Sequence, residues 1–302
     1  MNQFSSASRR IDSMLVWVLS DRIKERSERV ILFIAIGSFI SHLLLIALVN
    51  LRLISFESTF LRNPISAIYT PFSFILVYEV YLLLFYLPKS TSFYIGKQYE
   101  IITLIVIRRI FKDLGDLQLI DKWFENKNDL QFTFDAITSL ILFFLIYLYY
   151  HKIMVIKVPK ADTADQSKSH TSSFVVLKKI IALILVPVML ALACYSFYHW
   201  VTANMQSGIS GTNVLSYINS VFFDEFFTVL IIVDVLLLLA SFFYSDRFHT
   251  IIRNSGFVLS TILLKISFSV SGILNNLLII GAVLFGLLIL YIHQLYEKAE
   301  QF

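Results

Sequence analysis

The sequence is poor in the residues that build turns and cross-links. Its 302 residues include one cysteine, five prolines and nine glycines. The single cysteine, Cys194, excludes a disulfide within this chain and any metal centre that needs several thiolates. An outer-membrane β-barrel needs frequent turns and alternating segments of about ten residues, and the sequence shows no such pattern. Long packed helices are therefore the expected architecture.

Charged residues are also scarce. They make up 15% of the chain, whereas 57% of the residues are hydrophobic; a soluble domain contains about 25% charged residues. The mean hydropathy of +0.75 comes from long apolar runs, and runs of about 18 or more residues predict transmembrane helices. The net charge of +4 is typical of membrane topology signals rather than of nucleic-acid binding. The composition predicts an integral membrane protein.

Recognisable catalytic motifs are missing. The sequence contains no phosphate-binding loop, no dinucleotide-binding glycine motif, no HExxH motif and no GxSxG motif. Its six histidines are scattered over five predicted elements, without the paired placement that a haem between helices needs. We therefore expect no enzymatic activity, no metal site and no cofactor.

Seven apolar runs are long enough to cross a bilayer, since about 20 helical residues span its core of about 30 Å. They are residues 29–51, 67–88, 132–150, 180–200, 226–244, 256–272 and 277–296. The last two are so close in the sequence that we expect a tight turn between them. The predicted fold class is all-α: a polytopic helical membrane protein with seven or eight transmembrane helices.

The polar segments divide the chain further. Apolar residues recur at helical spacing over 8–27 and predict an N-terminal amphipathic helix that lies along the membrane interface. A polar stretch predicts a cytoplasmic linker between two helical halves. The expected organisation is an interfacial helix in 1–28, a first half in 29–157, the linker in 158–173 and a second half in 174–302.

The charged stretch GKQYEIITLIVIRRIFKDLGDLQ, residues 96–118, decides between seven and eight spans. If it crosses, 17 lysines and arginines lie on the cytoplasmic side and 7 outside; if it does not, the numbers are 13 and 11. The positive-inside rule favours crossing, with both termini cytoplasmic. Hydropathy opposes it, because each charge at the centre of a span costs about 2.5–3.5 kcal/mol. Two alternatives stay open: a spanning helix whose charged stripe faces protein or water, and a cytoplasmic helix on the membrane surface.

Ionisable residues inside the predicted spans are the candidate functional residues, because such groups are costly in a bilayer and usually face the bundle interior. Asp234 and Lys265 lie in consecutive spans, and we expect them to pair. By the same argument, Glu79 pairs with Arg108 or Arg109. The candidate site residues are Glu79, Arg108, Arg109, Asp234 and Lys265, with Glu100, His42 and Asn276 as secondary candidates.

These charges support two hypotheses for function. In the first, the protein is a channel or a proton- or cation-coupled transporter, and the charged residues form a polar track through the bundle. In the second, the same charges only pair helices in a non-conducting scaffold, sensor or subunit of a larger membrane complex. Both hypotheses place a multi-pass protein in a cell (inner) membrane. Its expected partners are the lipid bilayer and either copies of itself or other membrane subunits.

Overall fold

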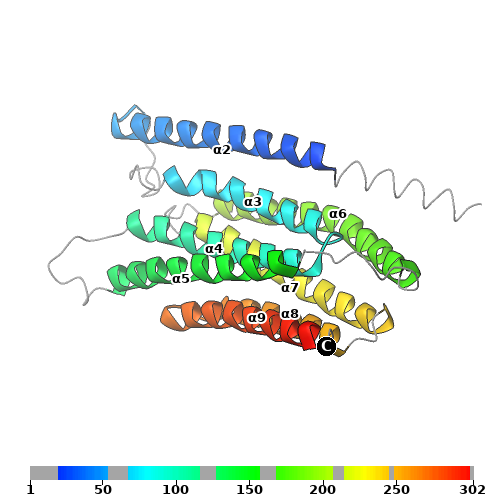
Figure 1. Ribbon diagram of the computed structural model, residues 1–302. Coiled ribbons are helices and arrows are strands. Elements are labelled where there is room, and N and C mark those ends of the chain that lie inside the picture. The colour runs from blue at the N-terminus through cyan, green and yellow to red at the C-terminus, as the bar shows by residue number, and fades with distance from the viewer. Residues whose placement is uncertain are drawn as a thin grey trace, which may run out of the picture.

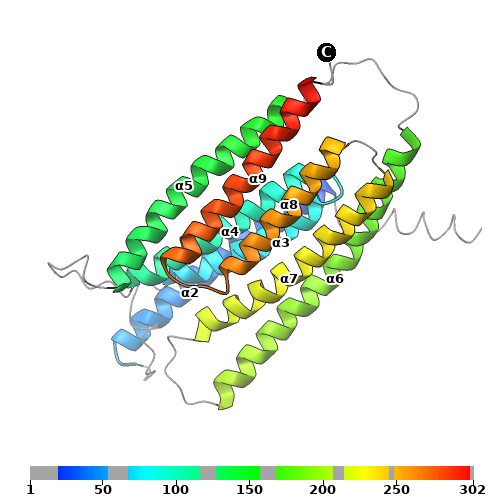
Figure 2. The ribbon, with the colours of Figure 1, turned by 90° about the horizontal axis from the view of Figure 1, so that it is seen from below.

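The computed structural model describes residues 20–53, 67–115, 127–156, 168–206, 214–244 and 248–299. In these ranges the chain forms long α-helices and no β-strand, so the predicted all-α class is confirmed. The helices lie side by side in one bundle (Figures 1 and 2). They are α2 (Asp21–Asn50), α3 (Tyr69–Tyr86), α4 (Thr91–Gly115), α5 (Lys127–Ile156), α6 (Lys168–Gln206), α7 (Val214–Tyr244), α8 (Phe248–Ser267) and α9 (Ile273–Ala299).

Five helices in the described ranges are long and apolar enough to cross a membrane: α2, α5, α6, α7 and α9. Helix α3 contains a shorter apolar segment. Large apolar side chains project outward from the bundle; Phe243 is 85% exposed and Phe33 is 74% exposed. Such exposure is costly in water and suits a lipid-facing surface. The chain is therefore a membrane protein with several apolar helices. By length and hydropathy, fewer helices qualify as spans than the seven or eight predicted. Polar residues lower the hydropathy of α4 and α8.

Helix α4, which contains most of the charged stretch 96–118, lies inside the bundle (Figure 2). It packs against α3, α5 and α8. Tyr99, Ile101, Thr103 and Val106 are almost completely buried, and at 100° per residue they cover more than half of the helix circumference. A helix lying on the membrane surface buries one face only. Helix α4 is therefore sheltered by protein on more than one side.

Two element boundaries differ from the expected organisation. Helix α2 begins at Asp21, where the Ser20 hydroxyl accepts a hydrogen bond from the backbone N–H of Ile23 at 3.2 Å and caps the helix. Residues 21–28 are therefore part of α2, and the remainder of the predicted amphipathic helix lies outside the described residues. Helix α6 begins at Lys168, inside the predicted linker.

The tight turn expected between the last two spans is confirmed. Helix α8 ends at Ser267 and α9 begins at Ile273. Gly272 has a φ of +74°, a left-handed conformation that glycine adopts at little cost. The Asn275 side chain donates a hydrogen bond to the Ser267 carbonyl at 2.5 Å. This bond satisfies one of the carbonyls left open at the end of α8.

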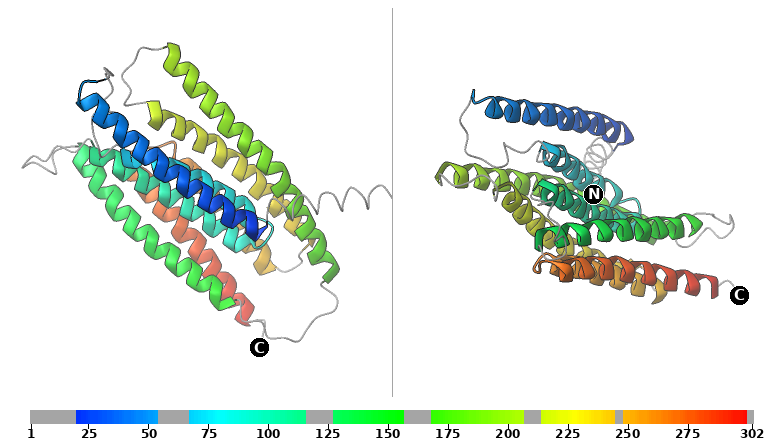
Figure 3. Two further views of the ribbon diagram at one scale, coloured as in Figure 1. Left: turned by 90° about the horizontal axis from the view of Figure 1, so that it is seen from above. Right: turned by 90° about the vertical axis from the view of Figure 1, so that its left-hand side faces the viewer.

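The two predicted halves pack together. Helix α4 contacts α8, α5 contacts α9, and α3 contacts α6. Helix α2 lies at the edge of the bundle, against α3 (Figure 3). The centre of the bundle is therefore formed by α4 together with helices from both halves, and the buried polar residues lie around it.

Candidate functional site

Asp234 is a buried carboxyl group about two-thirds of the way along α7, with 4% of its surface exposed. Its Oδ2 accepts a hydrogen bond from the side-chain amide of Gln98 on α4 at 3.0 Å. Gln98 in turn accepts a hydrogen bond from the Thr261 hydroxyl of α8 at 2.7 Å. Gln98 and Thr261 are both completely buried. Three helices thus contribute to a hydrogen-bonded chain that ends on a carboxyl group, and within the described residues no cation pairs with it.

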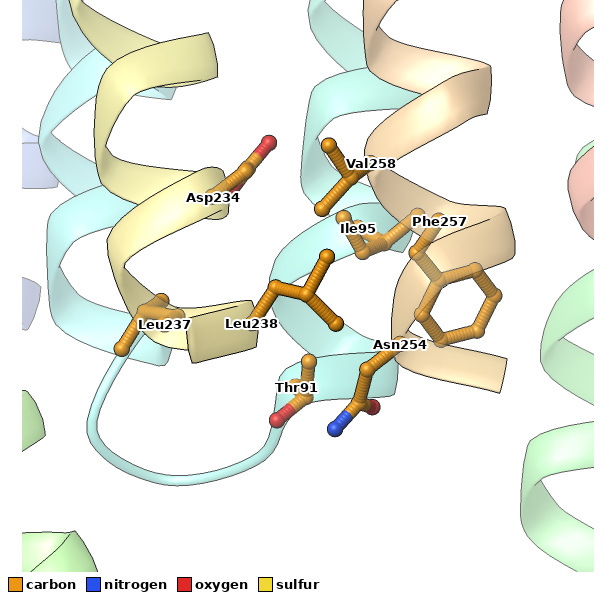
Figure 4. Close-up of a pocket in the computed structure, with 8 residues that line it drawn as sticks. All are labelled: Thr91, Ile95, Asp234, Leu237, Leu238, Asn254, Phe257 and Val258. Carbon is orange, nitrogen blue, oxygen red and sulfur yellow. The ribbon is translucent and has the colours of Figure 1, made fainter. Parts of the chain in front are cut away.

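A small cavity of about 20 Å³ lies beside Asp234 (Figure 4). This volume is enough for about one water molecule. Besides Asp234, its polar lining consists of Thr91 at the start of α4 and Asn254 on α8. In Figure 4 these two side chains lie at the opposite side of the cavity from Asp234. The cavity therefore separates the buried carboxyl from a second group of polar residues.

The polar residues continue beyond this cavity. Lys178 of α6 is 6% exposed and donates a hydrogen bond to the Thr91 hydroxyl at 2.7 Å. Arg253 donates to the Asn254 side chain at 3.2 and 3.3 Å, and its Nη1 lies 2.9 Å from Nε2 of His293. His293 is on the last turns of α9. Polar groups therefore follow one another from Asp234 to the end of the bundle where α8 begins and α9 ends, which we call the His293 end.

A tightly packed layer lies next to Gln98 and Thr261. The Tyr99 hydroxyl is 2.8 Å from the Ser260 hydroxyl, which donates to the Ala282 carbonyl at 2.8 Å. Gly286 of α9 makes room for Tyr99, because a Cβ atom at this position would lie 1.8 Å from the tyrosine oxygen. Each of these polar side chains is buried and hydrogen-bonded, which is how buried polar groups are normally accommodated.

A second buried carboxyl, Asp135 of α5, lies at the opposite end of the bundle. It is completely buried and accepts two hydrogen bonds from Arg109 of α4, from Nε at 2.5 Å and from Nη2 at 3.1 Å. Arg109 also donates to Asn275 at 2.8 Å and to Asn276 at 2.7 Å, both on α9. Asp135 accepts further bonds from Asn276 and Gln131. This Arg109 cluster joins α4, α5 and α9 at what we call the Arg109 end.

The bidentate geometry of Arg109 on Asp135 is the strongest form of ion pair available to side chains. Arg109 and Asp135 each have several hydrogen-bond partners in the cluster, and their two formal charges cancel. Such an arrangement specifies which helices meet. The Arg109 cluster therefore has the features of a structural ion pair.

A third group of charges lies between α3, α4 and α5. Lys97 is 3.8 Å from Glu79 and also contacts Glu100. Glu100 accepts a hydrogen bond from the Tyr150 hydroxyl at 2.5 Å. All three charged side chains are mostly buried: those of Lys97 and Glu79 are each 15% exposed, and that of Glu100 is 26% exposed. The group holds one cation and two carboxylates, but nothing in the described part of the chain links it to Asp234.

The structure corrects the predicted ion pairs. Asp234 bonds to Gln98 and not to Lys265. Glu79 faces Lys97, whereas Arg109 pairs with Asp135, so neither predicted arginine partner of Glu79 is right. The prediction did identify α4 as the neighbour of the helix that carries Glu79, but it placed the contact near the wrong end of α4.

The remaining candidates are also located. Arg108 is buried in α4, with 6% of its surface exposed. Lys265 is partly exposed near the end of α8. His42 is buried against α3, with Nδ1 2.6 Å from the Thr70 hydroxyl. Asn276 belongs to the Arg109 cluster. Among the eight candidates, Arg109 and Asn276 are hydrogen-bonded to one another, and Glu79 and Glu100 share Lys97.

Two residues that organise these sites were missed. Asp135 is close to the start of its apolar run, where a charge is inexpensive, so its complete burial is not evident from the sequence. Gln98 is uncharged and stands among stronger signals in α4. A signal was nevertheless present for Gln98, which is a polar residue on an otherwise apolar face of its helix, and such residues usually face the bundle interior.

One group of described residues has the geometry of metal ligands. His249 of α8 and His293 and Glu297 of α9 can each offer one ligand atom such that all three atoms lie within 4.8 Å of one another. The scattered positions of the histidines in the sequence did not predict this cluster, because His249 and His293 meet only when α8 packs along α9.

Comparison with known proteins does not assign a function to these sites. No protein-family model, no curated protein and no solved structure matches the chain.

Proposed function

We propose that the protein is a multi-pass membrane transport protein for protons or proton-coupled cations, and that Asp234 is the residue that binds and releases the proton. The observation that carries this proposal is the environment of Asp234: a buried carboxyl with neutral hydrogen-bond partners, next to a cavity with room for about one water.

The proposal includes eight spans with both termini cytoplasmic. Helices α3, α4 and α8 lie alongside the five apolar helices (Figure 1), and successive helices run in opposite directions through the bundle. With α4 crossing, the distribution of lysine and arginine follows the positive-inside rule. The His293 end is then cytoplasmic and the Arg109 end faces outside.

The chemistry of Asp234 suits proton binding. An ionised carboxylate is very costly to bury unless it is paired, whereas the neutral acid is not. Asp234 lacks a paired cation within the described residues, and ionisable groups inside membranes commonly act in proton relays. When Asp234 is ionised, the Gln98 amide remains as a donor to it. When it is protonated, its hydroxyl can donate to a water in the cavity.

The track from Asp234 to the cytoplasm runs through Thr91 and Asn254. Both line the same cavity as the carboxyl. Thr91 is bonded to Lys178, and Asn254 to Arg253. These cations favour a proton-coupled mechanism over a free cation pore, because they would repel an unaccompanied cation. The Arg109 cluster lies at the opposite end of the bundle and holds a compensated ion pair.

The alternative is a non-conducting scaffold or subunit. The Arg109 cluster favours this alternative, since it joins three helices with its charges cancelled. The two proposals differ in whether Asp234 is needed for flux or only for folding.

Proton flux into proteoliposomes distinguishes them. Purified protein is reconstituted with a pH-sensitive dye inside the vesicles, and a potassium gradient with valinomycin sets the membrane potential. We expect flux from the unmodified protein and loss of at least 90% of it in Asp234→Asn at equal protein content. Asp21→Asn, which removes an exposed carboxyl, is the matched control and should retain flux. Full flux in Asp234→Asn contradicts the role of Asp234, and no flux from the unmodified protein supports the scaffold.

The topology is tested separately by labelling one introduced cysteine. In a Cys194→Ser background, Asn126→Cys should react with a membrane-impermeant maleimide from outside intact cells. Protection from outside, with labelling after the membrane is opened, contradicts the crossing of α4.

A further inference from the structure

The His293 end of the bundle contains a cluster that the transport proposal does not use. It consists of His249 in the first turn of α8, with His293 and Glu297 one turn apart on α9. Both histidines are 3% exposed. Their rings lie 4.9 Å apart between centroids, tilted by 32°. Two buried histidines and a carboxylate therefore meet where the first turn of α8 packs against the last turns of α9.

We propose that His249, His293 and Glu297 bind one divalent transition-metal ion, with zinc as the preferred metal. Two imidazole nitrogens and one carboxylate oxygen form a ligand set that zinc uses in proteins. The absence of thiolate ligands disfavours Cu(I), and the two nitrogens disfavour Ca²⁺ and Mg²⁺, which prefer oxygen.

The distances fit such a site closely. Zinc bonds of about 2.0–2.1 Å in a tetrahedral arrangement place neighbouring ligand atoms about 3.4 Å apart. Nε2 of His293 and Oε1 of Glu297 are already 3.3 Å apart. One atom from each of the three residues lies within 4.8 Å of the others, so the widest pair needs a movement of only about 1.4 Å. Rotation of a histidine side chain is enough to make this adjustment.

The i,i+4 spacing of His293 and Glu297 explains why they share a face of α9, since such residues are neighbours on a helix surface. Glu297 is the most accessible of the three, with 36% of its side chain exposed. An ion can therefore enter from the side of Glu297 and reach the two buried imidazoles. Three protein ligands leave a fourth position for water.

Arg253 is the group that competes with a metal ion. Its Nη1 lies 2.9 Å from Nε2 of His293. Because a guanidinium can only donate, Nε2 of His293 must be the acceptor, and a neutral imidazole then carries its proton on Nδ1. The lone pair that a metal requires is thus already directed at a cation. Metal binding needs the Arg253 side chain to turn away from His293.

Metal binding to the full-length protein in detergent tests the proposal. After treatment with a chelator, the protein is titrated with Zn²⁺ by calorimetry, and bound zinc is counted by mass spectrometry after gel filtration. We expect about one equivalent in the unmodified protein. Co²⁺, used as a spectroscopic probe, should give d–d absorption bands that zinc removes. Failure of the unmodified protein to retain zinc overturns the proposal whatever the variants do.

Substitutions then locate the ion. His249→Ala and His293→Ala should each weaken zinc binding at least 10-fold, and Glu297→Gln should weaken it less strongly. The matched control is His151→Ala, which removes an exposed histidine of α5 and should bind as the unmodified protein does. Arg253→Gln should bind zinc more tightly, because the competing cation is absent. Unchanged binding in the His249→Ala/His293→Ala double variant overturns the proposal.

Melting temperatures distinguish a loss of zinc binding from misfolding of a variant. Saturating zinc should raise the melting temperature of the unmodified protein and of His151→Ala, since a ligand that binds only the folded state stabilises it. Glu297→Gln, which removes a partly exposed group, is expected to fold and to show a smaller zinc-dependent rise. An equal rise in Glu297→Gln and in the unmodified protein excludes Glu297 as a ligand and overturns the site as proposed. The metal test is independent of flux, so its outcome does not depend on the proposed transport.

Discussion

Asp234 and Asp135 are both buried carboxyl groups inside a helical bundle, yet their surroundings differ in almost every respect. Asp135 is bound by two nitrogens of Arg109 and by two side-chain amides. Asp234 accepts a hydrogen bond from the neutral Gln98 amide, lies near the Thr261 and Tyr94 hydroxyls, and borders a cavity. The Arg109 cluster is closed and electrically balanced, whereas the Asp234 site is open on one side and has no opposite charge in the described residues.

The difference follows from how each site compensates a buried charge. A bidentate arginine compensates Asp135 permanently, and removing either partner leaves an uncompensated charge. Asp234 relies on the Gln98–Thr261 chain and on the exchange of a proton. We infer that stability depends most on the Arg109 cluster and that function depends most on the Asp234 site. The following variants test this separation, from the largest expected change in stability to the smallest.

Asp135→Leu should be the most destabilising change, because it leaves Arg109, whose side chain is 29% exposed, without its carboxylate. Loss of one partner of a fully buried ion pair costs about 3–5 kcal/mol of unfolding free energy, and the partial exposure of Arg109 places the expected loss at about 3 kcal/mol. The measurement is unfolding by SDS titration, with the melting temperature in mild detergent as a second readout. The Arg109→Met/Asp135→Leu double variant is the control and should recover more than half of the loss. A single variant as stable as the unmodified protein contradicts the structural role of the cluster.

Gly286→Ala should have the next largest effect. The added Cβ meets the Tyr99 hydroxyl, which is buried and hydrogen-bonded to Ser260. Overpacking of this kind costs about 1–3 kcal/mol. The matched control is Gly281→Ala on the same helix, where an added Cβ has no atom within 4 Å. The control should be as stable as the unmodified protein or slightly more stable, since alanine favours helix over glycine. Equal melting temperatures for the two variants contradict the packing of α4 against α9.

Thr261→Val removes the hydroxyl that donates to Gln98 while preserving the shape of the side chain. The lost hydrogen bond is expected to cost about 1 kcal/mol. Flux should fall as well, because Gln98 is no longer held against Asp234. Thr250→Val in the same helix serves as the control and should leave flux unchanged. A variant with lower stability and full flux removes Thr261 from the proposed track.

Asp234→Asn should have the smallest effect on stability, below about 1 kcal/mol, because asparagine keeps an oxygen that can accept the bond from Gln98. Melting temperatures of Asp234→Asn and Asp135→Asn in the same detergent give the direct comparison. We expect Asp135→Asn to melt at the lower temperature. If Asp234→Asn is the less stable of the two, the assignment of structural and functional carboxyls is reversed.

Much of the fold could be predicted, because the signal is local. An apolar run of about 20 residues predicts a membrane helix wherever it packs, and the runs in α2, α5, α7 and α9 become such helices. The close spacing of the last two runs was enough to predict the turn at Gly272. The stretch 96–118 stayed ambiguous, since its hydropathy does not reveal that α3, α5 and α8 surround it.

The sites could be predicted only in part, because contacts between helices depend on their order and rotation. Asp234 stood out as a charge in an apolar run, but its partner Gln98 is uncharged and belongs to the other half of the chain. Arg109 was identified, but Asp135 was not, because a carboxylate near the start of a run is unremarkable until α4 and α9 cover it. His249 and His293 likewise meet only through the packing of α8 along α9.

The sequence by itself determined that this chain is a helical membrane protein whose interior contains ionisable groups, because hydrophobic runs and isolated charges act residue by residue. Only the tertiary structure decided which carboxyl meets a cation and which meets a cavity. The physical reason is that each helix can face its polar residues toward several neighbours, and the close packing of the bundle selects one arrangement. In that arrangement Arg109 lies on Asp135, and Asp234 has the amide of Gln98 and space for about one water.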